Sequence, residues 1–448
     1  MKSLLLLLAL LPAVMLPAPV GTASEGAHVE VTKDVYEEDM AFALKELEAQ
    51  CGSFFELKDI DWKKVSKRFS AEAKKVRTDQ QHWLMLVRLM AQLKDGHCQV
   101  RLTDPESGIE VPEEWKEEHK GPGFFLCKIG NKYYTKNVWS SAASLGLAPG
   151  MEVLSLDGVA MKKWIPQRIE EIREVRSFST DQHVLHWVLN RGFSKPLNES
   201  LKIEYKDHDG KKRKRTVRLD RASAVPDGPA FFPKDYTYEG DSVRYGHTTR
   251  GFGYIHFRRT GDDLMSGLDK ALDALQDVKG MILDFRGNSG GGCDHDDLEG
   301  RFVPKGMSMP RMARDPLAST GDHPYGGPLI VIVDGTTVSA GETTSGMFKE
   351  DGRAYMIGES PTAGMSSQKT NIPLPSGKFT LYVSVGSNRS SFNGGRGIEG
   401  IGVIPNEIVE FHPDDLFQSI DTITARAEAL LEAYPSEHVK YKPSDYGW

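Results

Sequence analysis

The pattern of apolar and polar positions divides the chain into stretches of different periodicity. From 27 to 105, apolar residues recur every three or four positions, which predicts a helical N-terminal region. From 121 to 222, short alternating runs between turn residues predict a small β-rich unit. From 250 to 412, apolar runs alternate with helical segments, and 413–448 reads as a helix at 416–434 with a tail. The overall prediction is a multi-domain α/β (α+β) protein with a layered α/β core.

Helical spacing is clearest in three segments of the N-terminal region, at 35–50, 61–68 and 80–93. Gly96 is a plausible stop for the third helix, and a short alternating run follows it. His97 is therefore expected at a sharp corner between a helix and a strand. A single histidine in such a place is more often structural than functional, so position alone does not assign it a role.

Residues 328–351 combine a buried strand with a helix start. The run at 329–333 is apolar and β-branched without a polar interruption, which predicts a strand buried on both faces. A helix-compatible segment begins at or just after Ser339. Ser339 is then either a helix N-cap, with Glu342 completing a capping box, or a nucleophile placed beside free helix N–H groups.

A glycine-rich loop at 286–292 follows another predicted strand, at 279–285. It lacks the GxxxxGK[ST] and GxGxxG patterns of phosphate-binding loops, so an anion hole built from backbone N–H groups is the better interpretation. Loops that follow neighbouring parallel strands share one edge of a sheet. The glycine-rich loop and the Ser339 turn are therefore expected to face the same crevice.

Composition indicates a soluble globular protein of two or three domains. The chain has 448 residues, and 39% are hydrophobic and 27% charged. A formal net charge of −7 argues against a general nucleic-acid-binding protein. The one basic run, at 211–215, follows an Asp- and Gly-containing turn and is interpreted as a solvated hairpin tip.

The first 23 residues have the pattern of a secretory signal peptide. Lys2 precedes a short leucine-rich run, and small residues lead to Ala23, where cleavage is expected. The mature protein is therefore expected to be exported, either to the periplasm or outside the cell, and membrane association is not required. A retained signal anchor is the alternative.

No metal or organic cofactor is expected from the sequence. The four cysteines have no CxxC spacing, although an exported protein allows Cys51 to pair with Cys98. Cys293 lacks the basic surroundings of a reactive thiol. The polar run at 294–297 contains ligand-type side chains, but its spacing favours the start of a helix.

The unit at 121–222 resembles a PDZ domain. The matching features are a Gly-Pro-Gly-Phe-Phe loop, an Ala-Ala-x-x-Gly-Leu-x-Pro-Gly turn and a Glu-Val-Leu-Ser-Leu-Asp-Gly strand. The resemblance implies peptide capture at Gly123, Phe124 and Phe125, because loop N–H groups can bind a terminal carboxylate and a strand edge can pair with a peptide. A small β-rich domain without a ligand is the alternative. Residues 223–250 are rich in Pro, Gly and Asp and are interpreted as a linker.

Five motifs in order carry a wider family resemblance. The chain is similar to the C-terminal processing (tail-specific) and tricorn-like serine peptidases, which have a PDZ domain and a ClpP/crotonase-like catalytic core. The motifs include a Lys-Asp-Gly-His segment and a late Ile-Glu-Gly-Ile-Gly segment, and they cover nearly the whole mature chain. They lie at 93–98, 282–291, 338–342, 358–364 and 398–406.

The resemblance implies roles for residues around the strand-to-helix turn. Ser339 matches the nucleophile, and the N–H of Ala340 would supply one oxyanion donor. Gly291 would supply the other donor, with Gly290 and Gly292 as alternatives.

The same resemblance decides between two kinds of general base. The processing-peptidase branch uses a lysine where this chain has Gly364, so a Ser–Lys dyad is disfavoured. The tricorn-like branch uses a histidine that His97 matches and a glutamate that Glu399 matches. Glu399 would then orient His97 for proton transfer. The serine that precedes the histidine in that branch is replaced by Gly96.

The resemblance thus implies an exported serine endopeptidase that acts on proteins or peptides. Relatives of this fold also include binding proteins such as the interphotoreceptor retinoid-binding protein modules. A non-catalytic binding protein and a PDZ-led interaction protein are therefore the alternatives. The sequence does not determine the oligomeric state or the substrate preference.

Overall fold

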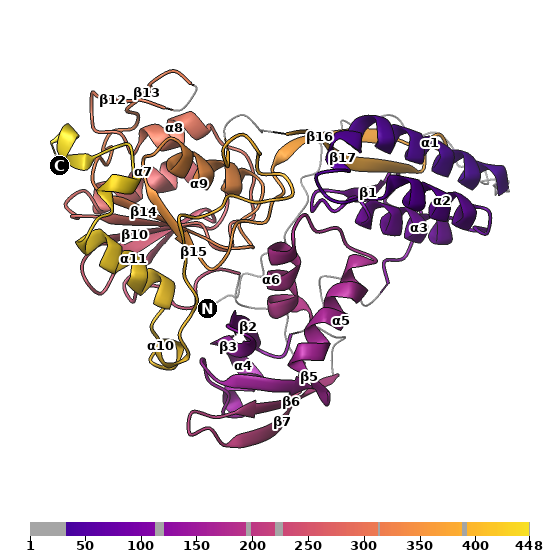
Figure 1. Cartoon of the computed structure of the whole chain (residues 1–448), viewed down its shortest axis with the longest axis horizontal. Coiled ribbons are helices and arrows are strands. Elements are labelled where there is room, and N and C mark those ends of the chain that lie inside the picture. The colour runs from indigo at the N-terminus through magenta and orange to yellow at the C-terminus, as the bar shows by residue number, and fades with distance from the viewer. Residues whose placement is uncertain are drawn as a thin grey trace, which may run out of the picture.

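The computed structural model describes residues 33–112, 121–193, 199–219, 227–311, 314–387 and 392–447. The predicted signal peptide at 1–23 lies outside these residues. Figure 1 shows three lobes: a layered core, an N-terminal helical lobe and a third lobe that contains β2 to β7 and α4 to α6. No helix of the described ranges is long and apolar enough to span a bilayer.

A seven-stranded mixed sheet forms the centre of the core, in the order β18-β15-β14-β11-β10-β9-β8. Adjacent strands from β10 to β18 pair in parallel, whereas β9 and β8 are antiparallel additions at one end. In chain order the strands are β8 (Thr237–Glu239), β9 (Val243–His247), β10 (Gly253–Phe257), β11 (Met281–Asp284), β14 (Leu329–Val333), β15 (Tyr355–Gly358) and β18 (Glu407–Ile408).

The strand β14 is buried on both faces, as predicted. Leu329, Val331 and Val333 pack into one apolar cluster, to which the helices α7 to α9 contribute. Ile330 and Ile332 point the other way, into a second cluster with α11. Helices on both faces of one sheet confirm the predicted layered α/β core. The core helices are α7 (Leu264–Ala274), α8 (His295–Gly300), α9 (Ala340–Glu350), α10 (Pro413–Phe417) and α11 (Thr422–Glu432).

Two predictions at the ends of the core are wrong. Residues 223–250, interpreted as a linker, contain β8 and β9, whose polar and aromatic residues hide the strand pattern. The single helix predicted at 416–434 is two helices. The predicted helix is interrupted at Asp421. Its carboxylate accepts hydrogen bonds from the N–H groups of Ile423 and Thr424, so that a new helix, α11, begins there.

The N-terminal lobe is completed by a hairpin from the core. It consists of α1 (Lys33–Cys51), α2 (Trp62–Ala73), α3 (Asp79–Ala91) and β1 (Gln99–Leu102), to which β16 (Ser367–Pro373) and β17 (Phe379–Ser387) are added. The strand β17 pairs antiparallel with β1, and its apolar residues join the helical cluster. The hairpin was predicted as part of the core, but it holds the N-terminal lobe instead (Figure 1).

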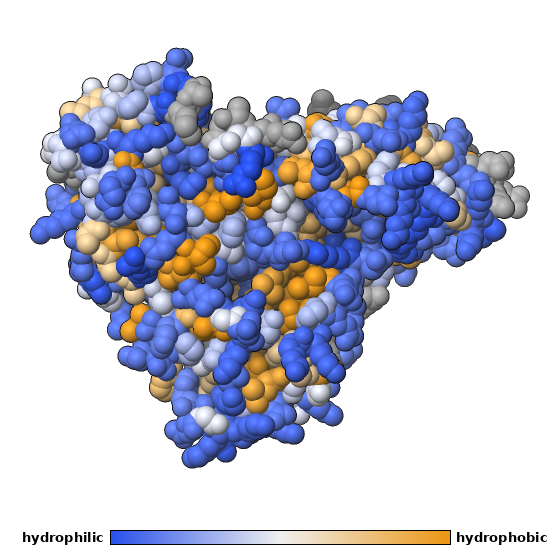
Figure 2. All heavy atoms as spheres, in the orientation of Figure 1, coloured by the Kyte–Doolittle hydropathy of each residue, from blue (hydrophilic) through white to orange (hydrophobic). Residues whose placement is uncertain are grey.

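The third lobe is a β-sheet covered by helices. Its strands follow the order β2-β3-β4-β6-β7, so β2 and β7 are edge strands of the described sheet. Figure 2 shows that apolar surface on this face of the molecule gathers where the lobes meet. The elements are β2 (Phe124–Ile129), β3 (Lys132–Val138), α4 (Ser140–Ser144), β4 (Glu152–Leu156), β5 (Val159–Ala160), α5 (Met161–Arg173), α6 (Asp181–Arg191), β6 (Ser200–Lys206) and β7 (Lys212–Arg218).

A buried ion pair ties the glycine-rich loop to α11. The Arg286 guanidinium donates to Asp284 and, at 3.0 Å, to Asp421. We expect Asp421→Ala to lower the free energy of unfolding by about 3 kcal/mol or more, because it removes one partner of a buried charge. The exposed pair Arg426–Glu407 supplies the control, and Glu407→Gln should cost less than about 1 kcal/mol. Equal urea midpoints for the two variants would contradict this expectation.

Candidate active site

Ser339 lies at the turn between β14 and α9 in an unusual backbone conformation. Its φ and ψ are 55° and −123°, a region that non-glycine residues rarely adopt. Ser339 is the N-cap of α9, as predicted, and its N–H donates to Glu342 Oε2 at 3.1 Å. This contact helps to hold the strained conformation, and the Ser339 hydroxyl lies near His97.

Glu342 joins the turn to the loop after β15. The buried carboxylate also accepts hydrogen bonds from the Thr362 hydroxyl and from the N–H groups of Gly364 and Met365. Burial raises the pKa of Glu342 to about 7, although the hydrogen bonds oppose that rise. The loop that carries a lysine in processing peptidases therefore serves here to hold the Ser339 turn.

The glycine-rich loop packs directly on the Ser339 turn, so the two share an edge of the sheet as predicted. Val338 N–H donates to Asn288 O at 3.0 Å. A Cβ added to Gly290 would lie 2.7 Å from Ser339 Cβ, and Gly290 has a φ of +74°. Only glycine meets both conditions without rearrangement.

Hydrogen bonding separates the three glycines proposed as oxyanion donors. Gly290 N–H donates to Asn288 Oδ1, and Gly292 N–H donates to Thr260 O. The N–H groups of Gly291 and Ala340 have no such partner among the described residues. The two donors named from the motifs are thus the ones left available to an oxyanion.

His97 faces Ser339 across the boundary between lobes. Its Nε2 lies 3.2 Å from Ser339 Oγ. The turn that carries it follows α3, and two serines of the third lobe hold it: Ser177 Oγ accepts from Asp95 N–H, and Ser179 Oγ accepts from Gly96 N–H. All three lobes therefore contribute to the position of the imidazole.

The carboxylate beside His97 is Asp95 and not Glu399, the residue named from the sequence. Asp95 Oδ1 lies 3.6 Å from His97 Nδ1 and accepts the His97 backbone N–H at 2.9 Å. Glu399 is buried and accepts instead from Lys58 Nζ at 2.7 Å. Lys58 also lies 4.0 Å from Asp95, so Glu399 is connected to the imidazole only through two intervening residues.

Sequence reasoning missed Asp95 and Lys58. Asp95 stands two residues before His97 in the same motif, so the sequence already indicated that the two side chains could lie close together. Burial raises its pKa, but the Lys58 charge and the hydrogen bond from His97 outweigh burial and hold that pKa well below the ordinary range. Burial and the Asp95 charge raise the pKa of Glu399 to about 8, against the opposing effect of Lys58. Nothing in the local sequence of Lys58 marks it.

Neighbouring side chains leave no room for a serine at Gly96, the position where the tricorn-like branch has one. A Cβ added to Gly96 would lie 2.4 Å from Met365 Sδ and 3.0 Å from His183 Cε1. A serine at position 96 therefore needs Met365 to move.

The residues predicted to bind peptides lie at the start of β2. Phe124 and Phe125 are buried as whole residues, at 0% and 1% exposure, so neither their rings nor their backbone groups are open to a peptide in this structure. Gly123 has a φ of +84°, and its carbonyl accepts from Trp139 N–H.

The predicted helix start at 294–297 is confirmed, because Asp294 caps α8 through Asp297 N–H. All four cysteines are free, so Cys51 and Cys98 are not joined.

Comparison with known proteins identifies the class to which this site belongs. Residues 251–409, which include Ser339 and the glycine-rich loop, match peptidase family S41. Residues 251–409 are thus similar to that family, in agreement with the resemblance carried by the motifs in this part of the chain.

The curated relatives are carboxy-terminal processing proteases. The protease CtpB of Bacillus subtilis is 25% identical over 254 residues, covering 54% of this chain and 46% of the relative. A carboxy-terminal-processing protease of Bartonella bacilliformis is 28% identical over 207 residues, covering 43% of this chain and 44% of the relative. The chain thus spans less than half the length of these two relatives.

Solved structures extend the likeness to the whole fold. Mature CPAF in complex with lactacystin superposes with a TM-score of 0.63 at 12% identity, covering 90% of this chain and 98% of CPAF. A peptidase of Parabacteroides merdae gives a TM-score of 0.51 at 17% identity, covering 88% of this chain and 96% of that protein. At these identities the likeness establishes the arrangement of lobes and no more.

The close packing of the glycine-rich loop is testable by adding one methyl group. We expect Gly290→Ala to lower the melting temperature by about 4 °C or more, because the methyl group meets Ser339 and the φ is left-handed. Gly292→Ala is the matched control two residues away, where an added Cβ meets nothing within 4 Å and φ is not left-handed. Equal melting temperatures for the two variants in scanning fluorimetry would show that Gly290 does not pack closely on Ser339.

Proposed function

We propose that the chain is an exported serine endopeptidase in which Ser339 is the nucleophile and His97 the general base. The observation that carries the proposal is the 3.2 Å contact between His97 Nε2 and Ser339 Oγ. A distance in this range allows direct proton transfer from a hydroxyl to a neutral imidazole. The strained φ of 55° at Ser339 also supports the proposal, because strain of this kind gathers at nucleophile turns.

The reaction follows from this geometry. His97 Nε2 accepts the Ser339 Oγ proton as Oγ attacks the carbonyl carbon of the peptide bond. The N–H groups of Ala340 and Gly291 donate to the oxyanion that forms. The imidazolium then gives its proton to the departing amine, and water hydrolyses the acyl-enzyme with His97 again as the base. No metal or organic cofactor enters these steps.

Asp95 is proposed as the residue that orients His97 and stabilises its imidazolium. Its carboxylate is 3.6 Å from Nδ1, and a pKa held below the ordinary range keeps it charged at neutral pH. Glu399 is proposed as a positioning residue that acts through Lys58. This division differs from the simple His97–Glu399 pair that the family resemblance implies.

The third lobe is proposed to bind the tails of protein or peptide substrates in the manner of a PDZ domain. Support comes from the edge position of β2 in its sheet, because an open edge can pair with an extended peptide. Gly123, Phe124 and Phe125 are buried as whole residues, so they would contribute backbone groups to a peptide only after this edge is uncovered. Neither nucleic acid nor membrane is needed as a partner.

Ser339→Ala should abolish peptide cleavage and labelling by a fluorophosphonate, because both require the nucleophilic oxygen. The melting temperature should fall by no more than a few degrees. Ser360→Ala is the matched control, since its hydroxyl donates to Pro361 O in its own loop and has no other hydrogen bond to the described residues. Hydrolysis retained by Ser339→Ala would disprove the nucleophile. If the wild-type chain binds peptides without cleaving them, the alternative of a non-catalytic binding protein is favoured.

Paired carboxylate variants separate Asp95 from Glu399. Asp95→Asn should lower kcat by about 100-fold or more with little change in KM, because the imidazolium loses its charge partner. Glu399→Gln should lower kcat by less than about tenfold, since a carboxyl with a pKa of about 8 is mostly neutral at pH 7 and resembles an amide. Circular dichroism and melting curves serve as the folding control. A larger loss in Glu399→Gln would restore Glu399 as the orienting acid.

A further inference from the structure

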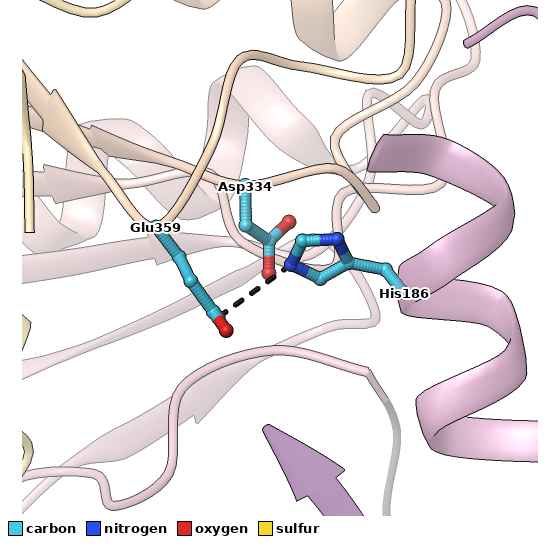
Figure 3. A group of neighbouring side chains, drawn as sticks. All are labelled: His186, Asp334 and Glu359. Carbon is cyan, nitrogen blue, oxygen red and sulfur yellow. Dashed lines mark ion pairs between the residues drawn. The ribbon is translucent and has the colours of Figure 1, made fainter. Parts of the chain in front are cut away.

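A second group of chemically active side chains lies between the third lobe and the core. His186 comes from α6, Asp334 follows β14, and Glu359 follows β15. Their ligand atoms all lie within 4.8 Å of one another. Figure 3 shows the imidazole of His186 and the two carboxylates directed toward one point. The proposed proteolytic steps use none of the three.

The group is buried and incompletely satisfied. Asp334 is 1% exposed, and its Oδ2 is buried without a hydrogen-bond partner among the described residues. His186 Nε2 is also buried, and its contact with Glu359 Oε2 is an ion pair at 3.5 Å. An unpartnered carboxylate oxygen in a buried place is costly unless a cation or proton reaches it.

Hydrogen bonds from neighbouring groups fix the orientation of His186 and Asp334, as they do for ligands in metal sites. The other nitrogen of His186, Nδ1, lies 2.9 Å from Gln182 O, which leaves Nε2 as the ligand atom. Asp334 Oδ1 accepts from the N–H and hydroxyl of Thr336, which leaves Oδ2 free. Ligating histidines and carboxylates in proteins are usually fixed in this way from outside.

We propose that His186, Asp334 and Glu359 form a binding site for a divalent transition-metal ion, with Zn²⁺ as the best match. One imidazole nitrogen and two carboxylate oxygens are ligands that zinc prefers, and two carboxylates neutralise its charge. Mg²⁺ and Ca²⁺ are disfavoured because an imidazole suits neither. The fourth position would be filled by water.

The ion needs only a small adjustment of the side chains. Ligand atoms in a tetrahedral zinc shell stand about 3.3 Å apart, and the His186–Glu359 distance of 3.5 Å already matches. Asp334 has to move closer by a change of its side-chain torsions. The ion would take the place of the present contact between His186 and Glu359.

The bound ion would fasten the third lobe to the core. His186 belongs to α6, whereas both carboxylates lie at the carboxyl ends of core strands. The Thr336 hydroxyl, which donates to Asp334, also accepts the N–H of Gly287 in the glycine-rich loop. The site thus reaches the structural support of the Ser339 turn without touching Ser339.

The test is a calorimetric titration of the chain lacking residues 1–23 with ZnCl₂ after treatment with a chelator. It is best done on Ser339→Ala, so that its outcome does not depend on the proposed peptidase activity. We expect one tight site, and a melting temperature about 2–4 °C higher with saturating Zn²⁺ than with chelator. Co²⁺ should give the visible absorption of a low-symmetry site with nitrogen and oxygen ligands.

Variants decide whether the three residues hold the ion. His186→Gln and Glu359→Gln should each weaken Zn²⁺ binding by about 100-fold or more, and both are used in case one fails to fold. His247→Gln is the control, because its imidazole is half exposed and faces only Asp235 on the surface. Unchanged Zn²⁺ affinity in both cluster variants, or no tight site in the parent, would overturn the proposal and leave a plain ion pair. Equal binding of Mg²⁺ would contradict the choice of metal.

Discussion

The carboxylate of Glu342 is the constraint on which the candidate active site depends. It accepts hydrogen bonds from Ser339, Thr362, Gly364 and Met365, which belong to two separate segments. A non-glycine residue at a φ of 55° costs on the order of 1–3 kcal/mol, and it persists only where its surroundings hold it. The hydrogen bonds of Glu342 keep the Ser339 turn in this conformation. Capping of α9 and presentation of the Ser339 hydroxyl are therefore consequences of one buried group, not competing interpretations.

The site is also a product of contact between lobes. His97 arrives from the N-terminal lobe, and the serines that hold its turn come from the third lobe. The hairpin β16–β17 leaves the core and pairs with β1, just beyond His97. With this pairing in place, Ser339 Oγ and His97 Nε2 lie 3.2 Å apart although 242 positions separate the two residues. The core contains Ser339 and the N–H groups of Ala340 and Gly291, whereas His97 comes from the N-terminal lobe.

Local pattern predicted the parts of the structure that local chemistry determines. The buried strand before Ser339, the helix start and the cap at Asp294 follow from short-range periodicity and capping. Ordered motifs pointed to His97, whose neighbourhood no periodicity reveals. The pairing of Glu399 with Lys58 could not be predicted, because their hydrogen bond joins residues 341 positions apart with no shared motif. Likewise, β8 and β9 become strands through their pairing with β10, not through an apolar pattern of their own.

The charges around His97 suggest why the chain keeps two buried carboxyl groups. With Asp95 ionised, Lys58 protonated and Glu399 neutral, this cluster has no net charge before the reaction. A proton on His97 adds one positive charge, which favours ionisation of a nearby carboxyl group. Asp95 lies 3.6 Å from the imidazole, whereas Glu399, whose pKa is raised to about 8 by burial and by the Asp95 charge, contacts Lys58 instead. The two buried carboxyl groups beside Lys58 thus have pKa values displaced in opposite directions, and Asp95 is the one that lies beside the imidazole.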